Sequence, residues 1–272
     1  LGFVVLARAI LLDNLADTFG EATIAFVKMD AEGAEERILA GALNFLARHA
    51  PIFMFEIKHG RTVNHSLIGA FRALGYGIYT HVPGLNVLCP HTDDDDLDSY
   101  QLNCFAVPPS RTAELIARDL IVDPDTDVPD APGNGWRTAA ELFTADATLL
   151  QSWNGLSSEA PNDGWAAHRD ALNLMIMARD TRHTASTRYV ALKTAIEILR
   201  DLVKSDGNVP RLCTLTRGLL NLGHRNFAVQ VLRRLAEMVT AAHKLPLPEP
   251  FLPLTAELEK RQTKLDLNSW LY

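Results

Sequence analysis

The sequence has little of what would assign it at once to a functional class. It contains only three cysteines in 272 residues, Cys89, Cys104 and Cys213, and no Cys-x-x-Cys pair. This argues against a disulfide framework or a thiolate zinc site and favours free thiols in the cytoplasm. The 26 Lys and Arg residues are outnumbered by 33 Asp and Glu, for a formal net charge of −7, which disfavours nucleic acid as a partner.

Long hydrophobic runs and common nucleotide or hydrolase motifs are also missing. The apolar run at residues 1–12 contains Arg8 and is too short to cross a bilayer, so no membrane partner is predicted and the run is interpreted as a core strand. Neither a Gly-x-Ser-x-Gly elbow nor a P-loop is present. The acidic run at residues 93–98 lacks the glycine and glutamate of a calcium loop, and the histidines follow no zinc spacing, so no metal site is predicted.

Residues 1–108 alternate short apolar runs with amphipathic stretches. The pattern predicts strands at 23–29, 52–57, 76–82 and 102–107, with helices at 31–49 and 63–74. Apolar strands alternating with helices predict an α/β fold with a parallel sheet covered on both faces. The last two strands are expected to form an antiparallel edge.

The rest of the chain carries no strand-like pattern. Residues 109–136 combine a helix with a linker rich in Pro, Gly and Asp, and residues 137–272 are predicted to form an all-α domain. The run AIEILRDL at 195–202 returns as AVQVLRRL at 228–235, displaced by 33 residues. This resembles a tetratricopeptide-type repeat, with a plain helical bundle as an equal alternative.

The stretch FVKMDAEGAEERILAG at residues 26–41 joins a predicted strand to a predicted helix. Asp30 is a suitable N-cap there, Glu32 and Glu35 suit the first helical turn, and Gly33 permits close approach of a ligand. A capped helix would explain these residues without any function. However, Asp30 and Glu56 each end a strand, and neighbouring strands lie about 4.8 Å apart. Such a pair of carboxylates suits orienting a hydroxyl, taking its proton or holding a cation.

Four segments in this order resemble the FkbM family of S-adenosylmethionine-dependent methyltransferases, over roughly residues 3–108. They are LLDNL at 11–15, VKMDAEGAEERILAGA at 27–42, PIFMFEI at 51–57 and ALGYGIY at 73–79. The resemblance implies a class I methyltransferase sheet, Rossmann-like, in which 23–29 is the fourth strand, 52–57 the fifth and the closing runs the sixth and seventh.

The resemblance also implies roles for individual residues. Asp30, Glu32 and Gly33 would bind S-adenosylmethionine, Asp30 would face both methyl donor and acceptor, and Glu56 would flank the acceptor. Asp30 and Glu56 are therefore the predicted catalytic residues. The implied reaction is O-methylation of a sugar or small-molecule hydroxyl, with the helical domain as a possible surface for a protein partner.

One departure from the family pattern concerns the cofactor loop. The glycine-rich loop after the family's first strand, and the acidic residue that ends its second, are not recognisable. We therefore expect the chain to hold the C-terminal half of a catalytic domain and to be inactive alone. The alternative is a non-catalytic interaction platform, built on a degenerate methyltransferase half and helical repeats.

Overall fold

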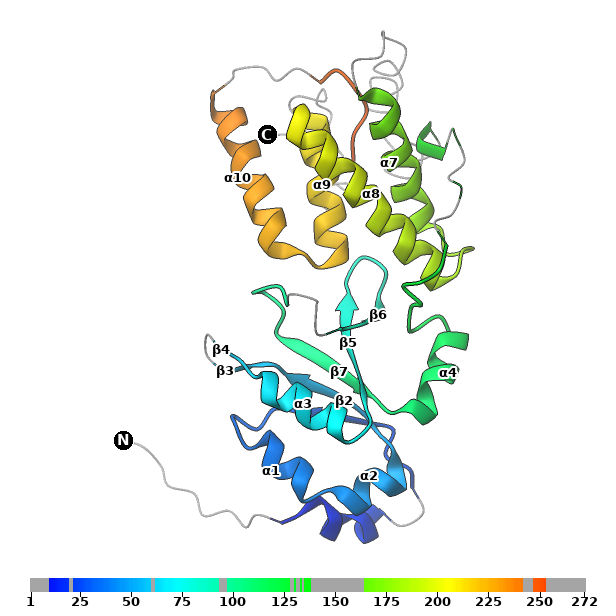
Figure 1. Ribbon diagram of the computed structural model, residues 1–272, viewed down its shortest axis with the longest axis vertical. Helices are drawn as coiled ribbons and strands as arrows, with labels where there is room; N and C mark the ends of the chain where they lie inside the picture. Colours follow the sequence, from blue (N-terminus) through cyan, green and yellow to red (C-terminus); the bar gives the residue numbers. More distant parts are fainter. Residues whose placement is uncertain are drawn as a thin grey trace, which may run out of the picture. The chain divides into compact units, whose positions relative to one another are not determined.

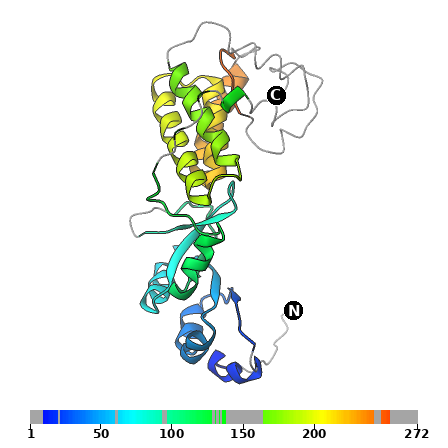
Figure 2. The same cartoon turned by 90° about the vertical axis from the view of Figure 1, so that its right-hand side faces the viewer.

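The computed structural model shows two compact units (Figures 1 and 2). It describes residues 10–19, 22–59, 62–92, 97–127, 130, 133, 135–137, 164–241 and 247–252. The first unit, here called the sheet unit, comprises residues 1–81, 88–97 and 101–118; the second, the helical unit, comprises 82–87, 98–100 and 119–272. Among the described helices, none has the length and apolar character needed to cross a membrane.

The sheet unit is built on a five-stranded sheet of order β1-β2-β7-β5-β6. The strands are β1 (Phe26–Met29), β2 (Ile52–Glu56), β5 (Gly77–Val82), β6 (Val87–Pro90) and β7 (Asn103–Val107). A separate two-stranded sheet joins β3 (Lys58–His59) to β4 (Thr62–Val63). The mixed α/β architecture confirms the coarse fold prediction.

The strand directions agree with a parallel start to the sheet and with the predicted antiparallel pairing of 76–82 with 102–107, and they correct the prediction where β7 also pairs antiparallel with β2. Strands β1 and β2 are parallel, and β7 runs antiparallel to both β2 and β5, so β5 has the same direction as β2. The strand β7 lies between β2 and β5 rather than at an edge. The strand at that edge of the sheet is β6, which was not predicted from the sequence.

One face of the sheet carries the core of this unit. Phe53 and Phe55 of β2 are fully buried, and their rings lie 5.2 and 4.6 Å from that of Phe71 in α3 (His65–Ala73). The other face is less well covered, because Phe26 is 51% exposed. The prediction that both faces are buried is therefore wrong at β1 in the part of the chain described.

The predicted helix over 31–49 is two short helices, α1 (Glu35–Ala40) and α2 (Leu43–His49). The break falls at Gly41, where a Cβ atom would lie 2.7 Å from Leu11 Cδ2. Residues 10 and 11 are exposed and form no strand, so the predicted core strand at 1–12 is wrong there; residues 1–9 lie outside the described chain.

Asp13 explains why a new helix begins after the break. It belongs to the 3-10 helix η1 (Leu12–Phe19), and its carboxylate accepts hydrogen bonds from the Phe45 backbone N–H at 2.8 Å and from Asn44 Nδ2 at 3.1 Å. Its own N–H donates to the Gly41 carbonyl at 3.2 Å. Asp13 thus caps α2 from another part of the chain.

We expect Asp13→Ala to destabilise the sheet unit by about 1 kcal/mol, because the α2 N-terminus loses its carboxylate cap. Hydrogen exchange at Phe45, followed by mass spectrometry, measures the effect locally. The neighbouring Asn14→Ala is the control, since Asn14 is exposed on the same 3-10 helix. Equal exchange in the two variants would contradict the capping role.

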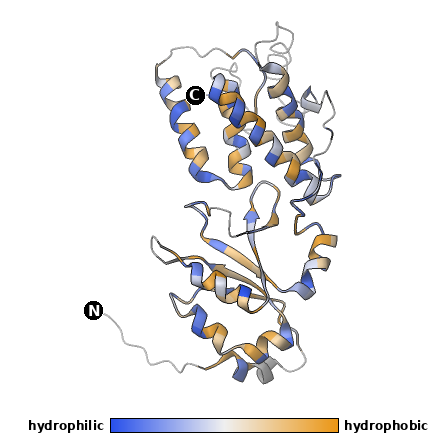
Figure 3. Cartoon of the chain, in the orientation of Figure 1, coloured by the Kyte–Doolittle hydropathy of each residue, from blue (hydrophilic) through white to orange (hydrophobic). Residues whose placement is uncertain are grey.

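The chain leaves the sheet unit through α4 (Pro109–Ala117). The helical unit contains α7 (Trp165–Arg179), α8 (Ala185–Ser205), α9 (Val209–Leu222) and α10 (Arg225–Ala241). Consecutive helices pack on one another, and apolar and polar residues alternate around them (Figure 3). The two copies of the sequence repeat lie in α8 and α10; a tetratricopeptide fold stays a prediction.

Helix α9 is buried along residues 209–219, and α8 approaches it closely at Gly218. A Cβ atom at Gly218 would lie 2.8 Å from Ile196 Cγ1 of α8. Although alanine in a helix is favoured over glycine by about 1 kcal/mol, overpacking a dense core costs about 1–3 kcal/mol. The close contact with Ile196 therefore decides whether alanine at position 218 raises or lowers the stability.

We expect Gly218→Ala to lower the thermal stability of the helical unit. The same substitution at Gly69 in α3 is the matched control, because a Cβ atom there meets nothing within 4 Å. Gly69→Ala should stabilise its own unit, by up to about 1 kcal/mol. Calorimetry of both variants tests the contrast, and a stabilised Gly218→Ala protein would show that α8 and α9 are not in close contact there.

Candidate functional site

The candidate site lies at the carboxyl edge of the parallel pair β1 and β2. The register pairs Met29 with Phe55, so Asp30 and Glu56 are the next residues along two adjacent parallel strands. In a parallel pair, residues in register point to the same side of the sheet. The structure therefore places these two predicted catalytic residues side by side at the level of the backbone.

Asp30 does not have the capping role that its position predicts. The N-cap of α1 is Ala34, which makes no side-chain cap. Instead Glu35, only 6% exposed, accepts a hydrogen bond from the Ala31 N–H at 3.0 Å. Because Glu35 reaches back along the chain to this amide, the Asp30 carboxylate is left available for a ligand.

The Asp30 side chain is 43% exposed and lies 3.3 Å from Lys28 Nζ, which is 58% exposed. An ion pair between two such exposed groups contributes little to the stability of the fold, because water screens it. A ligand can therefore replace Lys28 as the partner of the Asp30 carboxylate.

The turn between β1 and α1 uses two left-handed residues. Glu32 has a φ angle of 49° and Gly33 one of 93°. A Cβ atom at Gly33 would meet nothing within 4 Å, so open space borders the turn on that side. Glycine adopts this backbone conformation freely, whereas Glu32 bears some strain. The turn holds both residues predicted to bind the cofactor next to Asp30.

The structure adds residues that the sequence reading missed. Ser66 Oγ lies 2.5 Å from Glu36 Oε1 and 2.8 Å from Asn64 Oδ1, and its single proton serves one of them at a time. Asn64 also caps α3 by accepting from the Leu67 N–H at 3.1 Å. Asn-x-Ser before an apolar run was a recognisable cap signal, but the contact to Glu36 joins residues far apart in sequence.

The edge is acidic and exposed to solvent. Asp30, Glu32 and Glu36 are exposed, and Glu56 is half-buried. Carboxylates arranged in this way attract a cation and accept protons or hydrogen bonds from hydroxyl groups. Among the described residues there is no group of three or more His, Cys, Asp or Glu side chains arranged to hold a metal; residues 93–96 of the acidic loop lie outside them.

The cysteines offer no nucleophile to this site. All three are buried and none is in a disulfide. Burial raises the pKa of Cys104 and that of Cys213 to about 12, so both thiols stay protonated near neutral pH.

Comparison with known proteins identifies one similarity. Residues 5–78 match the sequence profile of the methyltransferase FkbM domain, which supports the methyltransferase family for this part of the chain. The match includes Asp30, Glu32, Gly33 and Glu56 and does not extend into the helical unit. Neither the curated proteins nor the solved structures contain a significant match.

Proposed function

We propose that the sheet unit is part of an S-adenosylmethionine-dependent methyltransferase that transfers a methyl group to a hydroxyl oxygen. The observation that carries the proposal is the placement of Asp30 and Glu56 at adjacent strand ends, within the segment similar to FkbM methyltransferases. We further infer that the acceptor is a sugar or small molecule and that the reaction is cytoplasmic, which the lack of any disulfide among the three cysteines supports.

The acidic edge fits the charge of the methyl donor. When bound, S-adenosylmethionine supplies a methyl group on a positively charged sulfonium sulfur, and it carries ribose hydroxyls and an ammonium group. Asp30 and Glu32 can accept hydrogen bonds from such groups, and the open space beside Gly33 allows close approach. Asp30 and Glu56 would then align the acceptor, and Asp30 would take the one proton that the acceptor hydroxyl loses as the methyl carbon leaves the sulfonium sulfur and bonds to the hydroxyl oxygen.

The edge of β1 that lacks a described partner strand is a place where further strands of a methyltransferase sheet could pair. Within the described residues β1 pairs only with β2, and Phe26 on it is 51% exposed. We propose that further parallel strands of a class I methyltransferase sheet pair at this edge and supply a glycine-rich cofactor loop. The 272-residue chain alone would then bind the donor weakly and turn over poorly.

The second candidate function is a non-catalytic interaction platform. An open strand edge beside an exposed aromatic residue is also what a protein partner covers by adding a strand. The full-length protein means here the 272 residues together with the further strands proposed above. Calorimetric titration of the full-length protein with S-adenosylmethionine separates the two functions. Donor binding without any methyl transfer to a broad panel of hydroxyl compounds would favour the platform, as would absence of binding.

We expect Glu56→Gln to raise the acceptor KM of the full-length protein by about tenfold or more, since Glu56 flanks the acceptor and a hydrogen bond to a charged group is lost. The affinity for S-adenosylmethionine should hardly change. Glu114→Gln is the control, because Glu114 is an exposed carboxylate on α4 paired with Arg118. An unchanged KM in Glu56→Gln would remove Glu56 from the acceptor site.

A further inference from the structure

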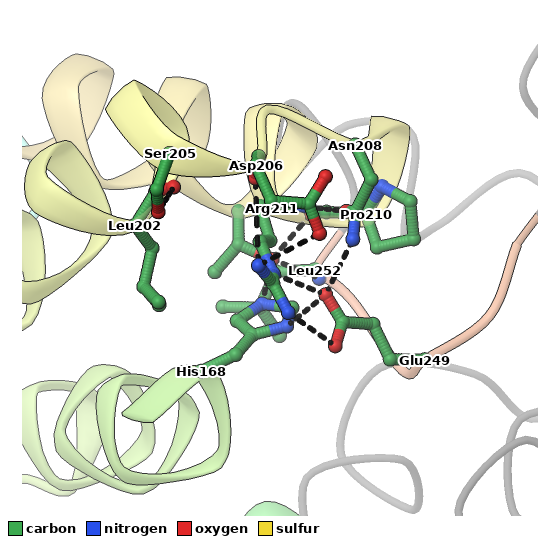
Figure 4. A network of polar contacts seen from close by, with 10 residues as sticks. His168, Leu202, Ser205, Asp206, Asn208, Pro210, Arg211, Glu249 and Leu252 are labelled. Carbon is green, nitrogen blue, oxygen red and sulfur yellow. Dashed lines mark hydrogen bonds and ion pairs between the residues drawn. The ribbon is translucent and has the colours of Figure 1, made fainter. Parts of the chain in front are cut away.

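A short irregular segment follows α10 in the helical unit and contacts charged side chains there (Figure 4). We call residues 247–252, with the sequence Leu-Pro-Glu-Pro-Phe-Leu, the strap. Its last four residues are buried, and Glu249, Phe251 and Leu252 are at most 2% exposed. The strap forms neither helix nor strand, so its side chains fix its position.

Glu249 is the most strongly held residue of the strap. Arg211 grips its carboxylate with two N–H groups, Nε to Oε1 at 2.6 Å and Nη2 to Oε2 at 3.2 Å. Asn208 Nδ2 donates to the same Oε1 at 3.0 Å, and His168 Nδ1 lies 3.0 Å from it. A two-pronged guanidinium contact of this kind selects a planar carboxylate by geometry as well as by charge.

Thr214 contacts both the backbone of the strap and His168. Its Oγ1 accepts from the Leu252 N–H at 3.2 Å and lies 3.2 Å from His168 Nε2. Thr214 Oγ1 also donates to the Pro210 carbonyl oxygen at 3.0 Å, so its single proton serves either that carbonyl or Nε2 of a neutral His168. Desolvation, which outweighs the adjacent Glu249, lowers the pKa of His168, consistent with this neutral form.

The residues that hold Glu249 come from rigid elements. Arg211 and Thr214 belong to α9, His168 to α7, and Asn208 caps α9 by accepting from the Arg211 N–H at 3.0 Å. The Arg211 side chain is itself 1% exposed and donates to Asp206 Oδ2 at 3.0 Å. The carboxylate-binding groups are thus carried by α7, α9 and the α9 cap, outside the strap itself.

The arrangement is costly if its only task is to close the core. Burying an ion pair costs desolvation energy, and well-packed apolar side chains of similar size often stabilise a protein equally well. What buried charges add is selectivity for one ligand geometry. The prolines on either side of Glu249 restrict the backbone, which lowers the entropy lost when such a segment binds.

We propose that His168, Asn208, Arg211 and Thr214 form a peptide-binding site for a short segment with a carboxylate between prolines and two apolar residues after it. The strap occupies this site as a ligand in cis. A segment of the same chemistry in another protein competes with the strap for the site. The helical unit is accordingly a peptide-recognition module with a built-in competitor.

The proposal is tested by offering the strap sequence in trans. A fluorescein-labelled peptide of residues 245–254 is titrated into the full-length protein and into the strap-weakened variant Glu249→Gln/Phe251→Ala, with fluorescence anisotropy as readout. The variant should bind the peptide at least about tenfold more tightly than the wild type, whose site is filled. A peptide with Gln in place of Glu should bind the variant about tenfold more weakly or worse.

Arg211 provides the matched control for selectivity. Adding Arg211→Gln to the strap-weakened variant should abolish the preference for the Glu peptide over the Gln peptide, which a merely structural strap would not show. Failure of the folded strap-weakened variant to bind, or equal affinity for the two peptides, would overturn the proposal.

A second measurement does not depend on the folding of a variant. In the wild-type protein, excess peptide should accelerate hydrogen exchange at the Leu252 amide, because the strap is displaced and its contact with Thr214 is lost. The Gln peptide is the control. Unchanged exchange at saturating Glu peptide would overturn the proposal.

Discussion

Asp30→Asn is expected to lower the methyl-transfer rate of the full-length protein by about 100-fold or more, the contribution typical of a positioned general base. The substitution keeps the shape of the side chain and removes its charge and its capacity to take a proton. Because Glu35 and not Asp30 holds the turn before α1, folding should hardly change. Loss of activity would then reflect chemistry rather than collapse of the strand–helix junction.

Two comparisons make the Asp30 experiment specific. Circular dichroism should show the same secondary structure and thermal transition in the variant and in the wild type. Glu35→Gln, in contrast, should lower the temperature of the thermal transition, since it weakens a partly buried hydrogen bond to the Ala31 N–H and destabilises the turn. Full methyl transfer by a folded Asp30→Asn protein would exclude Asp30 from the mechanism.

The second large effect is expected at the strap. Glu249→Gln should destabilise the helical unit by about 3–5 kcal/mol, because removing one member of a buried ion pair leaves the other charge poorly compensated. Trp fluorescence during urea unfolding isolates this unit, since all four tryptophans lie at position 136 or later and Trp165 contacts His168 at a centroid distance of 6.0 Å.

A double variant and an exposed pair serve as controls for Glu249→Gln. Replacing both partners, as in Arg211→Met/Glu249→Leu, should recover much of the lost stability, because no buried charge remains. Asp201→Asn should leave stability unchanged, because Asp201 and Lys204 form an exposed pair. Equal losses in the single and double variants would mean that packing, and not charge, holds the strap.

Acid should weaken the same contact in the wild-type protein. Desolvation favours a higher pKa for Glu249, but hydrogen bonds from His168, Arg211 and Asn208 outweigh it and lower the pKa from 4.5 to about 2. Its stabilising contribution is therefore complete above about pH 4.5 and is lost as the pH falls toward 2. Burial lowers the pKa of His168 from its usual 6.5. The unfolded chain therefore binds a proton at this histidine more readily, and the unfolding free energy of the helical unit also declines as the pH falls below 6.5.

The Glu249→Gln protein should lack the steeper part of this acid dependence. Its unfolding free energy should fall less between pH 4.5 and 2 than that of the wild type, because the titrating carboxylate is gone. Parallel pH profiles for the two proteins would show that Glu249 does not titrate with the depressed pKa.

What the sequence could predict differs from one element to another. The continuous apolar run at β2 and the amphipathic pattern at α3 are local, and both elements were predicted within two residues of their ends. The division of residues 31–49 into α1 and α2 was not predictable, because it depends on contacts of Gly41 with Leu11 and Asp13. Tertiary contacts outweighed a helical periodicity that was correct on its own.

The candidate sites show the same division. Asp30 and Glu56 could be placed together because parallel strands align their carboxyl ends, and the register agrees with this expectation. The strap could not be found, since a Pro-Glu-Pro segment after a helix is typical of a linker. Its partners Arg211 and His168 lie on two other helices, and nothing in their local sequence distinguishes them from surface residues.

Photochemical cross-linking tests the central claim most directly, because it locates the methyl donor on the chain. Ultraviolet irradiation of the full-length protein with methyl-labelled S-adenosylmethionine, followed by trypsin, separates residues 29–37, 38–48 and 49–58, since cleavage follows Lys28, Arg37, Arg48 and Lys58. We predict label in 29–37, reduced by Asp30→Asn, and none in 38–48. Specific labelling that is absent from both 29–37 and 49–58 would contradict a methyl-transfer site at this edge of the sheet.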